Sequence, residues 1–326
     1  MDLILSLITK NSYSKLKQTP ISLYNVLAST EQLPYETIIL VDDSDDETAE
    51  VFREWCDEKG KKLLACRSKT YGYGKPTRAT ARQTAVDVFL ENFREGWLMF
   101  VDDDVILNRG WWSWLEDNGI LNNDEVGEVW GINWDANPKR ERILQIFGLD
   151  LKDYLIRKFH ERGGTHDTLY KRKALEGIKI PPELHVYEDA YLHFWVICKG
   201  WESIVNPIGI LHYHPTFTDL KQDKEKIECA IKEALKYGIC EYEFAKIFEE
   251  GSKNKIKAYL MLARPLLGLA PMISTTVNLY GFKRGIKEAL KAQYLKLWFR
   301  WKVLRNITDT NIPNVCDVLA QQGGQG

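Results

Sequence analysis

Short apolar runs alternate with amphipathic stretches over the first two hundred residues. The runs have the length and composition of strands and lie at 3–8, 36–41, 62–66, 97–101, 126–134 and 203–213. Helical patterns separate them, at 16–27, in the stretch after Ser44 or Asp45 as N-cap, at 77–93 and at 188–196. This alternation is typical of a mostly parallel sheet flanked by crossover helices, so the sequence predicts an α/β fold.

Acidic residues follow two of the predicted strands. Asp42 and Asp43 end the run 36–41, and Asp102, Asp103 and Asp104 end the run 97–101. Ligands of open α/β sheets bind beyond the carboxyl ends of strands, so both clusters can serve one site. Burying an uncompensated carboxylate costs on the order of several kcal/mol, so three in succession suggest a divalent metal ion or a hydroxyl-rich ligand. A solvated acidic turn is the alternative.

The formal net charge of -2 hides a strong asymmetry along the chain. Segment 251–306 holds twelve Lys and Arg residues against the single acid Glu288. Within 283–305, apolar residues recur at three- and four-residue spacing between basic ones, which is typical of an amphipathic helix lying on an anionic membrane surface. A helix packed on the catalytic domain or on a second subunit is the alternative. The continuous apolar face argues against nucleic-acid binding.

Two further segments bear on location. The N-terminus lacks a positively charged region and a cleavage site, so it is predicted to be a first strand and not a secretion signal. Pro265 and Pro271 interrupt the apolar stretch 258–282, which favours a surface hairpin or re-entrant segment over a spanning helix. We therefore expect a cytoplasmic protein that is peripheral to the membrane.

Several segments, taken in order, resemble the family-2 glycosyltransferases of the GT-A fold. They are Thr9-Lys10-Asn11, Val41-Asp42-Asp43-Ser44-Asp45-Asp46-Glu47-Thr48, Ala81-Arg82-Gln83-Thr84-Ala85, Val101-Asp102-Asp103-Asp104, Gly163-Gly164 before Tyr170-Lys171-Arg172, Glu188-Asp189, and His212. The resemblance covers residues 3–215. It implies a GT-A catalytic domain at 1–215, with a mixed, mostly parallel sheet flanked by helices. The remainder, 216–326, is then a helical C-terminal region that associates with the membrane through 251–306.

The resemblance also implies roles for individual residues. Those expected to contact the nucleotide are Thr9, Asp42, Asp43, Arg82, Asp102 and Asp103. Asp104 would hold a Mg²⁺ or Mn²⁺ ion that bridges the donor diphosphate, although an Asp-x-Asp motif counted one residue later makes Asp103 the ligand. His212 or His214, which share one strand face, would be a further metal ligand. Only Arg82 is carried over from its motif, because Gln83 stands where the family has asparagine.

The pair Glu188-Asp189 matches the position of the family's catalytic base. Asp189 is the expected base and Glu188 its supporting neighbour, because inverting transfer needs one carboxylate to remove the proton of the acceptor hydroxyl. Both residues are also ordinary first-turn acids of a helix, which the helix dipole favours.

Together these features imply a metal-dependent, inverting glycosyltransferase. Its donor would be a UDP- or GDP-linked sugar. Its acceptor would be a hydroxyl or phosphate, which we expect to belong to a lipid-linked sugar or polyprenyl phosphate at the cytoplasmic membrane face. A homo-oligomer is compatible with this interpretation. A metal-dependent phosphoesterase and a catalytically silent membrane-surface scaffold are the alternatives.

Overall fold

In the computed structural model, the chain forms two compact units. The structure describes residues 2–17, 19–134, 163–184, 186–213, 232–239, 269–307 and 312–323, and the single positions 152, 156, 224 and 266. The first unit comprises Met1–Asp135, Gly163–Pro215 and Gln322–Gly326, and the second comprises Ala136–Arg162 and Thr216–Gln321. Every described residue of the expected site belongs to the first unit. His214 lies outside the described residues.

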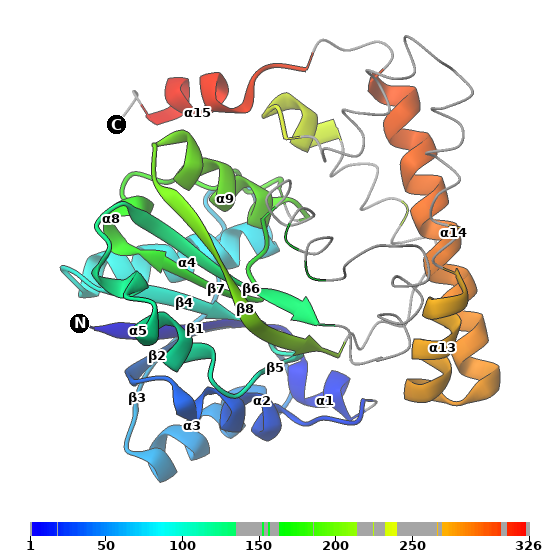
Figure 1. The fold of residues 1–326 in the computed structure, drawn as a ribbon, viewed down its shortest axis with the longest axis horizontal. Helices are drawn as coiled ribbons and strands as arrows, with labels where there is room; N and C mark the ends of the chain where they lie inside the picture. Colours follow the sequence, from blue (N-terminus) through cyan, green and yellow to red (C-terminus); the bar gives the residue numbers. More distant parts are fainter. Residues whose placement is uncertain are drawn as a thin grey trace. The chain divides into compact units, whose positions relative to one another are not determined.

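One sheet forms the centre of the first unit (Figure 1). Its strands are β1 (Leu3–Thr9), β2 (Tyr35–Asp42), β3 (Lys62–Cys66), β4 (Trp97–Val101), β5 (Val105–Leu107), β6 (Val126–Trp134), β7 (Asp167–Lys171) and β8 (Glu202–His212). They lie in the order β3-β2-β1-β4-β7-β6-β8-β5. The first four in this order pair in parallel, as do β6 and β8, whereas β7 and β5 run antiparallel to their neighbours. The expected mixed, mostly parallel sheet is confirmed.

Helices pack on this sheet and bury its strands. In the first unit they are α1 (Ser12–Leu16), α2 (Leu23–Ser29), α3 (Thr48–Lys59), α4 (Arg78–Asn92), α5 (Trp111–Asp117), α8 (Arg172–Leu175) and α9 (Glu188–Cys198), with 3-10 turns η1 (Thr30–Gln32) and η2 (Ile120–Asn122). Helix α4 contacts β1 and β2, and α9 contacts β6, β8 and α4. All five side chains of β4 are buried, which is why this strand is a continuous apolar run and does not alternate.

Parallel pairing brings the acidic strand ends to one edge of the sheet. Thr9 at the end of β1 pairs with Asp42 at the end of β2, and Ser6 of β1 pairs with Phe100 of β4. The aspartates after β4 therefore follow a strand next to β1. The edge that the two acidic clusters share is thus a consequence of strand register.

Two helix starts differ from the sequence expectation. The pattern predicted at 16–27 is divided around Pro20 into α1 and α2, and Ser22 forms a capping box with Asn25 at the start of α2. Helix α3 begins only at Thr48, so neither Ser44 nor Asp45 is its N-cap.

The capping prediction fails because both residues are engaged with the loop after β1. The Ser44 Oγ accepts a hydrogen bond from the Asn11 backbone N–H at 2.7 Å, and the Asp45 N–H donates to the Asn11 Oδ1 at 2.8 Å. Asp46 takes over the local role, because its Oδ1 accepts from the Thr48 N–H at 3.1 Å. A contact with a residue more than thirty positions away has displaced the local cap.

The described part of the second unit is mainly a helical hairpin. Helices α13 (Leu269–Tyr280) and α14 (Phe282–Ile307) pack together, and α15 (Val315–Gly323) follows. The approach is close at Gly285, where an added Cβ would lie 2.4 Å from the Val277 Cα. Pro271 lies in the first turn of α13, where a missing N–H costs no helical hydrogen bond. Among the described residues, no helix is both long and apolar enough to cross a membrane.

Candidate active site

The ends of β1, β2 and β3 are connected by two aspartates. The Asp42 Oδ1 accepts hydrogen bonds from the Thr9 hydroxyl at 2.8 Å and from the Ser44 N–H at 3.0 Å. The Asp43 carboxylate accepts from the Ser68 N–H at 3.1 Å with one oxygen and from the Ser68 hydroxyl at 2.5 Å with the other. Asp42 therefore shapes the turn after β2, and Asp43 joins that turn to the loop after β3.

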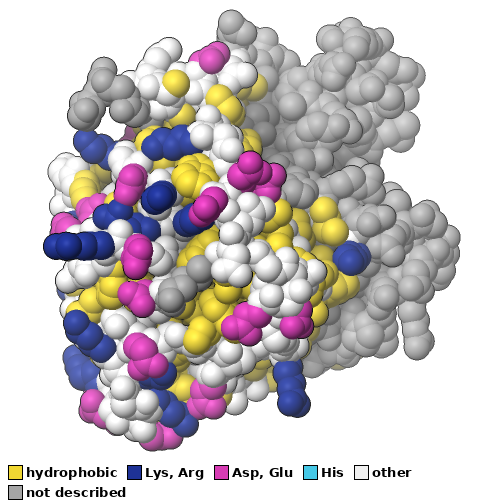
Figure 2. Space-filling view, turned by 60° about the vertical axis from the view of Figure 1, so that its left-hand side comes forward, with side chains coloured by type: hydrophobic (Ala, Val, Ile, Leu, Met, Phe, Trp, Pro, Cys, Tyr) yellow, Lys and Arg dark blue, Asp and Glu magenta, His cyan; other side chains and the backbone are white. Residues whose placement is uncertain are grey.

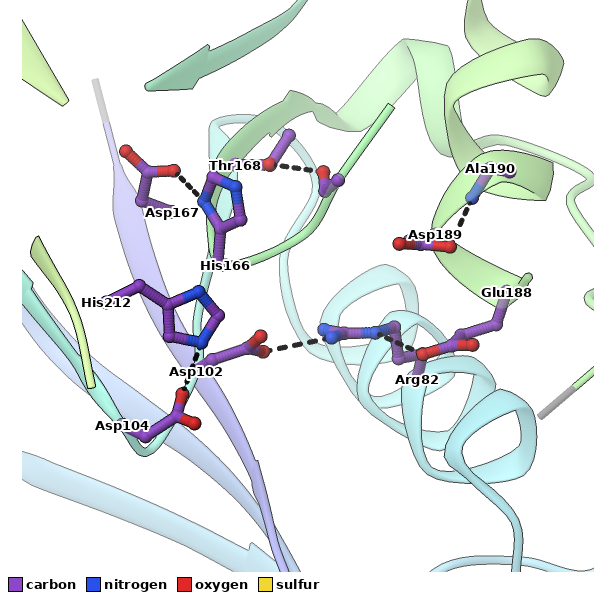
Figure 3. Close-up of polar contacts among 11 residues, drawn as sticks. Arg82, Asp102, Asp104, His166, Asp167, Thr168, Glu188, Asp189, Ala190 and His212 are labelled. Carbon is purple, nitrogen blue, oxygen red and sulfur yellow. Dashed lines mark hydrogen bonds and ion pairs between the residues drawn. The ribbon is translucent and has the colours of Figure 1, made fainter. Parts of the chain in front are cut away.

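Asp104 and His212 meet across the antiparallel pair β5 and β8. The His212 Nε2 lies 3.0 Å from the Asp104 Oδ1, and the Tyr213 N–H donates to the Asp104 carbonyl oxygen at 2.8 Å. Burial by itself would lower the pKa of His212, but the Asp104 carboxylate beside it outweighs that effect and raises the pKa. Both side chains are nearly buried. An oxygen and a nitrogen that can both ligate a metal ion thus lie next to each other (Figure 3).

Asp103 contacts α1. Its Oδ2 accepts a hydrogen bond from the Ser12 hydroxyl. Burial, and then the charge of Asp104, raise the pKa of Asp103 to about 6, against the opposing hydrogen bond from Ser12. The adjacent aspartates therefore have different partners: Asp103 is bonded to Ser12 of α1, and Asp104 to His212 of β8.

Ionisation of Asp103 should make the stability of the metal-free protein depend on pH. A raised folded-state pKa means that Asp103 contributes stability below its unfolded value of 3.8, and that this contribution is lost as the pH rises toward about 6. We expect the thermal midpoint of the wild type, relative to Asp103→Asn, to fall across that range. Differential scanning calorimetry of both proteins checks this. A midpoint difference that is constant with pH would contradict it.

Arg82 lies between Asp102 and Glu188 and joins the end of β4 to the start of α9. Its Nη2 donates to the Asp102 Oδ1 at 3.0 Å, and its Nε lies 3.5 Å from the Glu188 Oε1. The guanidinium carbon also stacks 5.0 Å from the centroid of the Phe100 ring. Only 5% of the Arg82 side chain and 4% of the Glu188 side chain are exposed. One buried cation therefore connects two elements of the expected site.

The pKa values of Arg82, Asp102 and Glu188 depend on one another. Burial would lower the pKa of Arg82, but Asp102 and then Glu188 raise it. Burial would raise the pKa of Asp102, but Arg82 and then His212 hold it below its usual range. For Glu188, burial and then the neighbouring Asp189 raise the pKa despite Arg82. Asp102 is thus the carboxylate that Arg82 keeps ionised.

Arg82→Lys should lower the free energy of unfolding by about 2 kcal/mol, because an ammonium group cannot span two carboxylates as a guanidinium does. Urea unfolding measures this. Arg53→Lys is the matched control, since Arg53 is exposed and pairs with Glu50 at the surface. Equal effects in the two variants would show that the bridge contributes nothing specific.

Asp189 lies in the first turn of α9, next to Glu188. It is half-buried, and its Oδ1 accepts a hydrogen bond from the Ala190 N–H at 2.8 Å. In Figure 3 it lies on one side of the Arg82 bridge, and Asp104 with His212 lies on the other. The expected base and the expected metal ligands are therefore separate parts of one site.

The sequence prediction missed His166 and Asp167. The His166 Nδ1 lies 2.5 Å from the Asp167 Oδ1, and the Asp167 Oδ2 accepts from the Trp111 indole N–H at 2.8 Å. The His166 ring centroid is 6.0 Å from that of His212, and its carbonyl oxygen accepts from the Asp102 N–H at 3.0 Å. Polar residues in a buried strand directly after Gly163-Gly164 were the available signal.

The donor atoms fit a divalent metal ion only as part of a larger ligand set. Within the residues that the structure describes, no group of three or more His, Cys, Asp and Glu side chains is arranged to hold a metal ion alone. A carboxylate oxygen and an imidazole nitrogen suit Mn²⁺ or Mg²⁺, provided that a bound ligand and water supply the other positions. Asp104 and His212 meet this chemical requirement.

Charged side chains of both signs are interspersed on the face of the molecule in Figure 2. Lys and Arg alternate there with Asp and Glu. Hydrophobic side chains are also exposed between them on this face.

The mixed α/β sheet with an acid-lined edge agrees with the GT-A fold that the sequence suggested. Residues 6–178, more than half of the chain, match the model of glycosyl transferase family 2, and the chain belongs to that family. It is therefore a glycosyltransferase. No curated protein matches the chain.

Three solved structures illustrate the similarity of fold. The mannosyltransferase PcManGT from Pyrobaculum calidifontis, in complex with GDP-Man and Mn²⁺, has a TM-score of 0.50 and 15% identity, with 98% of this chain and 86% of that chain covered. The structure of S. aureus TarS 1-349 has a TM-score of 0.48 and 16% identity, with 100% of this chain and 92% of that chain covered. Glucosyl-3-phosphoglycerate synthase from Mycobacterium tuberculosis, in complex with Mn²⁺, UDP-Glc and glycerol 3-phosphate, has a TM-score of 0.45 and 12% identity. The match covers 72% of this chain and 79% of that chain. At such identities the likeness concerns the fold.

Proposed function

We propose that this glycosyltransferase takes a sugar from a UDP- or GDP-linked donor in a Mn²⁺- or Mg²⁺-dependent, inverting reaction. The observation that carries the proposal is the convergence of the Asp104 Oδ1 and the His212 Nε2, 3.0 Å apart, at the carboxyl edge of the sheet. The complex of PcManGT with GDP-Man and Mn²⁺ supports the same donor class.

The nucleotide is proposed to bind where β1, β2 and β4 end. Carboxylates accept hydrogen bonds from ribose hydroxyls and from the N–H groups of a base. Asp43 and Asp102 are the groups assigned to this task, and Asp42 supports them through Thr9. Arg82 acts by holding Asp102 ionised, because its guanidinium is buried against that carboxylate.

Asp104 and His212 would hold the metal ion together with the donor diphosphate. Such an ion, when bound, acts as a Lewis acid that neutralises the charge of the leaving nucleoside diphosphate. Asp103 is less suited to this role, because Ser12 occupies one of its oxygens. His214, the other histidine expected on this face, lies outside the described residues.

Asp189 is the proposed base. Its carboxylate takes the proton of the acceptor hydroxyl as that oxygen forms a bond to the anomeric carbon and the bond to the diphosphate breaks. Asp189 suits this role better than Glu188, because Glu188 is buried against Arg82 whereas Asp189 is half-buried.

A calorimetric titration of UDP and then GDP, each with and without Mn²⁺, tests the donor site. Binding of one nucleotide only in the presence of Mn²⁺ would support the proposal and identify the base. Binding of neither nucleotide, or binding that does not depend on Mn²⁺, would refute it. The residues proposed to bind the nucleotide and the metal ion all belong to this chain, so the 326-residue protein is the material to use.

The acceptor is proposed to be lipid-linked, with α14 resting on an anionic membrane surface on the cytoplasmic side. Large apolar side chains on this helix are exposed, with 73% of Phe282, 50% of Leu290 and 48% of Trp301 accessible. Lys283 and Lys287 are exposed on the same helix. Apolar groups next to cations suit the boundary between lipid tails and anionic headgroups.

Flotation with vesicles that contain phosphatidylglycerol tests this surface. Phe282→Ser combined with Leu290→Ser should weaken binding, because apolar area is lost from the contact. The matched control is Tyr24→Ser, which alters an exposed aromatic residue of the first unit. Absence of wild-type binding, or equal binding of the double variant, would rule out membrane docking through α14.

A further inference from the structure

A buried polar cluster connects α9 to the two strands beneath it. The His193 Nδ1 of α9 lies 2.7 Å from the Glu128 Oε2 of β6, and the Ser203 hydroxyl of β8 donates to the same oxygen at 2.7 Å. The Trp130 indole N–H donates to the Ser203 Oγ at 3.1 Å. Glu128 is 0% exposed and His193 is 1% exposed. The cluster is therefore separated from solvent.

Stability alone does not account for this pair. Apolar residues of similar size in place of a buried ion pair are often neutral or stabilising, because desolvation offsets the attraction. The Tyr170 hydroxyl of β7 interacts with Glu128 as well, since burial and then the Glu128 carboxylate raise the pKa of Tyr170. The pair does provide a directional contact, which joins α9 to β6 at His193.

His193 lies one helical turn after Asp189 in α9. Residues four apart lie on the same side of a helix, so His193 supports the turn that begins at Asp189. Gly163 packs against this turn as well, since an added Cβ would lie 2.4 Å from the His193 Cβ and 3.4 Å from the Asp189 carbonyl oxygen. Arg82 holds the preceding residue, Glu188. Three separate contacts thus converge on the start of α9.

We propose that Glu128 and His193 are positioning residues that fix the rotation and height of α9, and so place the Asp189 carboxylate for removal of the acceptor proton. This inference rests on the proposed role of Asp189 as the base. An apolar contact at His193 would allow α9 to slide or turn, because van der Waals contacts are not directional. A hydrogen bond from a buried imidazole to a buried carboxylate allows one arrangement.

The test is the double variant Glu128→Met/His193→Leu, which replaces the pair by apolar side chains. We expect its thermal midpoint to be kept and its amide hydrogen exchange over 188–193 to be faster than in the wild type. Nucleoside diphosphate release from GDP-mannose or UDP-glucose, with Mn²⁺ present and water as acceptor, should have a kcat lower by about 10- to 100-fold. Calorimetric affinity for the nucleotide should be unchanged.

Two further variants make the result specific. His193→Asn keeps an N–H that can reach Glu128, and should recover much of the lost kcat. Val196→Ala is the control, because it opens a cavity on the same helix without removing a hydrogen bond. It should lower the thermal midpoint and leave kcat and the exchange at 188–193 unchanged.

The outcomes separate this inference from the base assignment. Unchanged exchange at 188–193 in the double variant overturns the inference, and this readout needs no substrate. A double variant with wild-type kcat overturns it as well, provided that Asp189→Asn has lost activity. If Asp189→Asn retains full kcat, the base assignment fails first, and the inference falls with it.

Discussion

Asp104→Ala is expected to abolish Mn²⁺-dependent nucleotide binding and to lower kcat/KM by roughly 10³-fold or more. The variant removes the carboxylate that faces His212 at the carboxyl edge of the sheet. Lewis-acid stabilisation of a leaving group is worth several kcal/mol, and each 1.36 kcal/mol corresponds to about tenfold in rate. Calorimetry with the nucleotide, followed by the sugar-transfer assay, measures both effects.

Asp104→Asn distinguishes the charge of Asp104 from its contact with His212. An amide oxygen can still accept a hydrogen bond from the His212 Nε2, but it is a weaker ligand for a hard cation. We expect this variant to keep the wild-type fold, by circular dichroism, and to lose activity nearly as far as alanine does. Asp124→Ala is the control, because Asp124 is fully exposed and pairs with Lys171 at the surface. Full activity of either Asp104 variant would refute the site assignment.

Asp189→Asn is expected to lower kcat by about 10²- to 10⁴-fold, which is the usual contribution of a positioned general base. Nucleotide affinity should not change, because Asp189 lies on the far side of the Arg82 bridge from Asp104 and His212 (Figure 3). Steady-state kinetics with saturating donor, together with calorimetry, separates the two quantities. A loss of nucleotide affinity equal to the loss of kcat would contradict the assignment.

Glu188→Gln decides between the two neighbouring carboxylates. Glu188 is buried and its Oε1 faces Arg82, so its replacement should reduce stability more than catalysis. If this variant loses more kcat than Asp189→Asn at a temperature where both are folded, the base is Glu188. The order of the two effects is therefore the informative result.

Much of the fold could be predicted because strand signals are local. The runs predicted at 97–101 and 126–134 match β4 and β6 in their bounds, since each is an apolar stretch that ends in polar residues. The acidic groups after β2 and β4 were visible for the same reason. Parallel pairing then made their shared edge a consequence of the α/β pattern.

Predictions that depended on a particular neighbour were less successful. Ser44 has the chemistry of an N-cap, but its oxygen accepts a hydrogen bond from Asn11. Glu128 and His193 were missed, although each is a single charged or titratable residue within an apolar segment. A buried residue of this kind needs a partner, and the pattern around it does not say which.

The sequence by itself determined six of the eight strands of the sheet, the helices α3, α4 and α9 in outline, and the acidic ends at which a nucleotide donor is proposed to bind, but it did not predict β5 and β7. These features depend on the hydrophobic period and on residue types along a short stretch of chain. Only the tertiary structure decided that Asp104 meets His212, that Arg82 joins Asp102 to Glu188, and that Glu128 meets His193. The physical reason is that a hydrogen bond depends on distance and direction in space, and residues far apart in sequence reach that distance only after the sheet has formed.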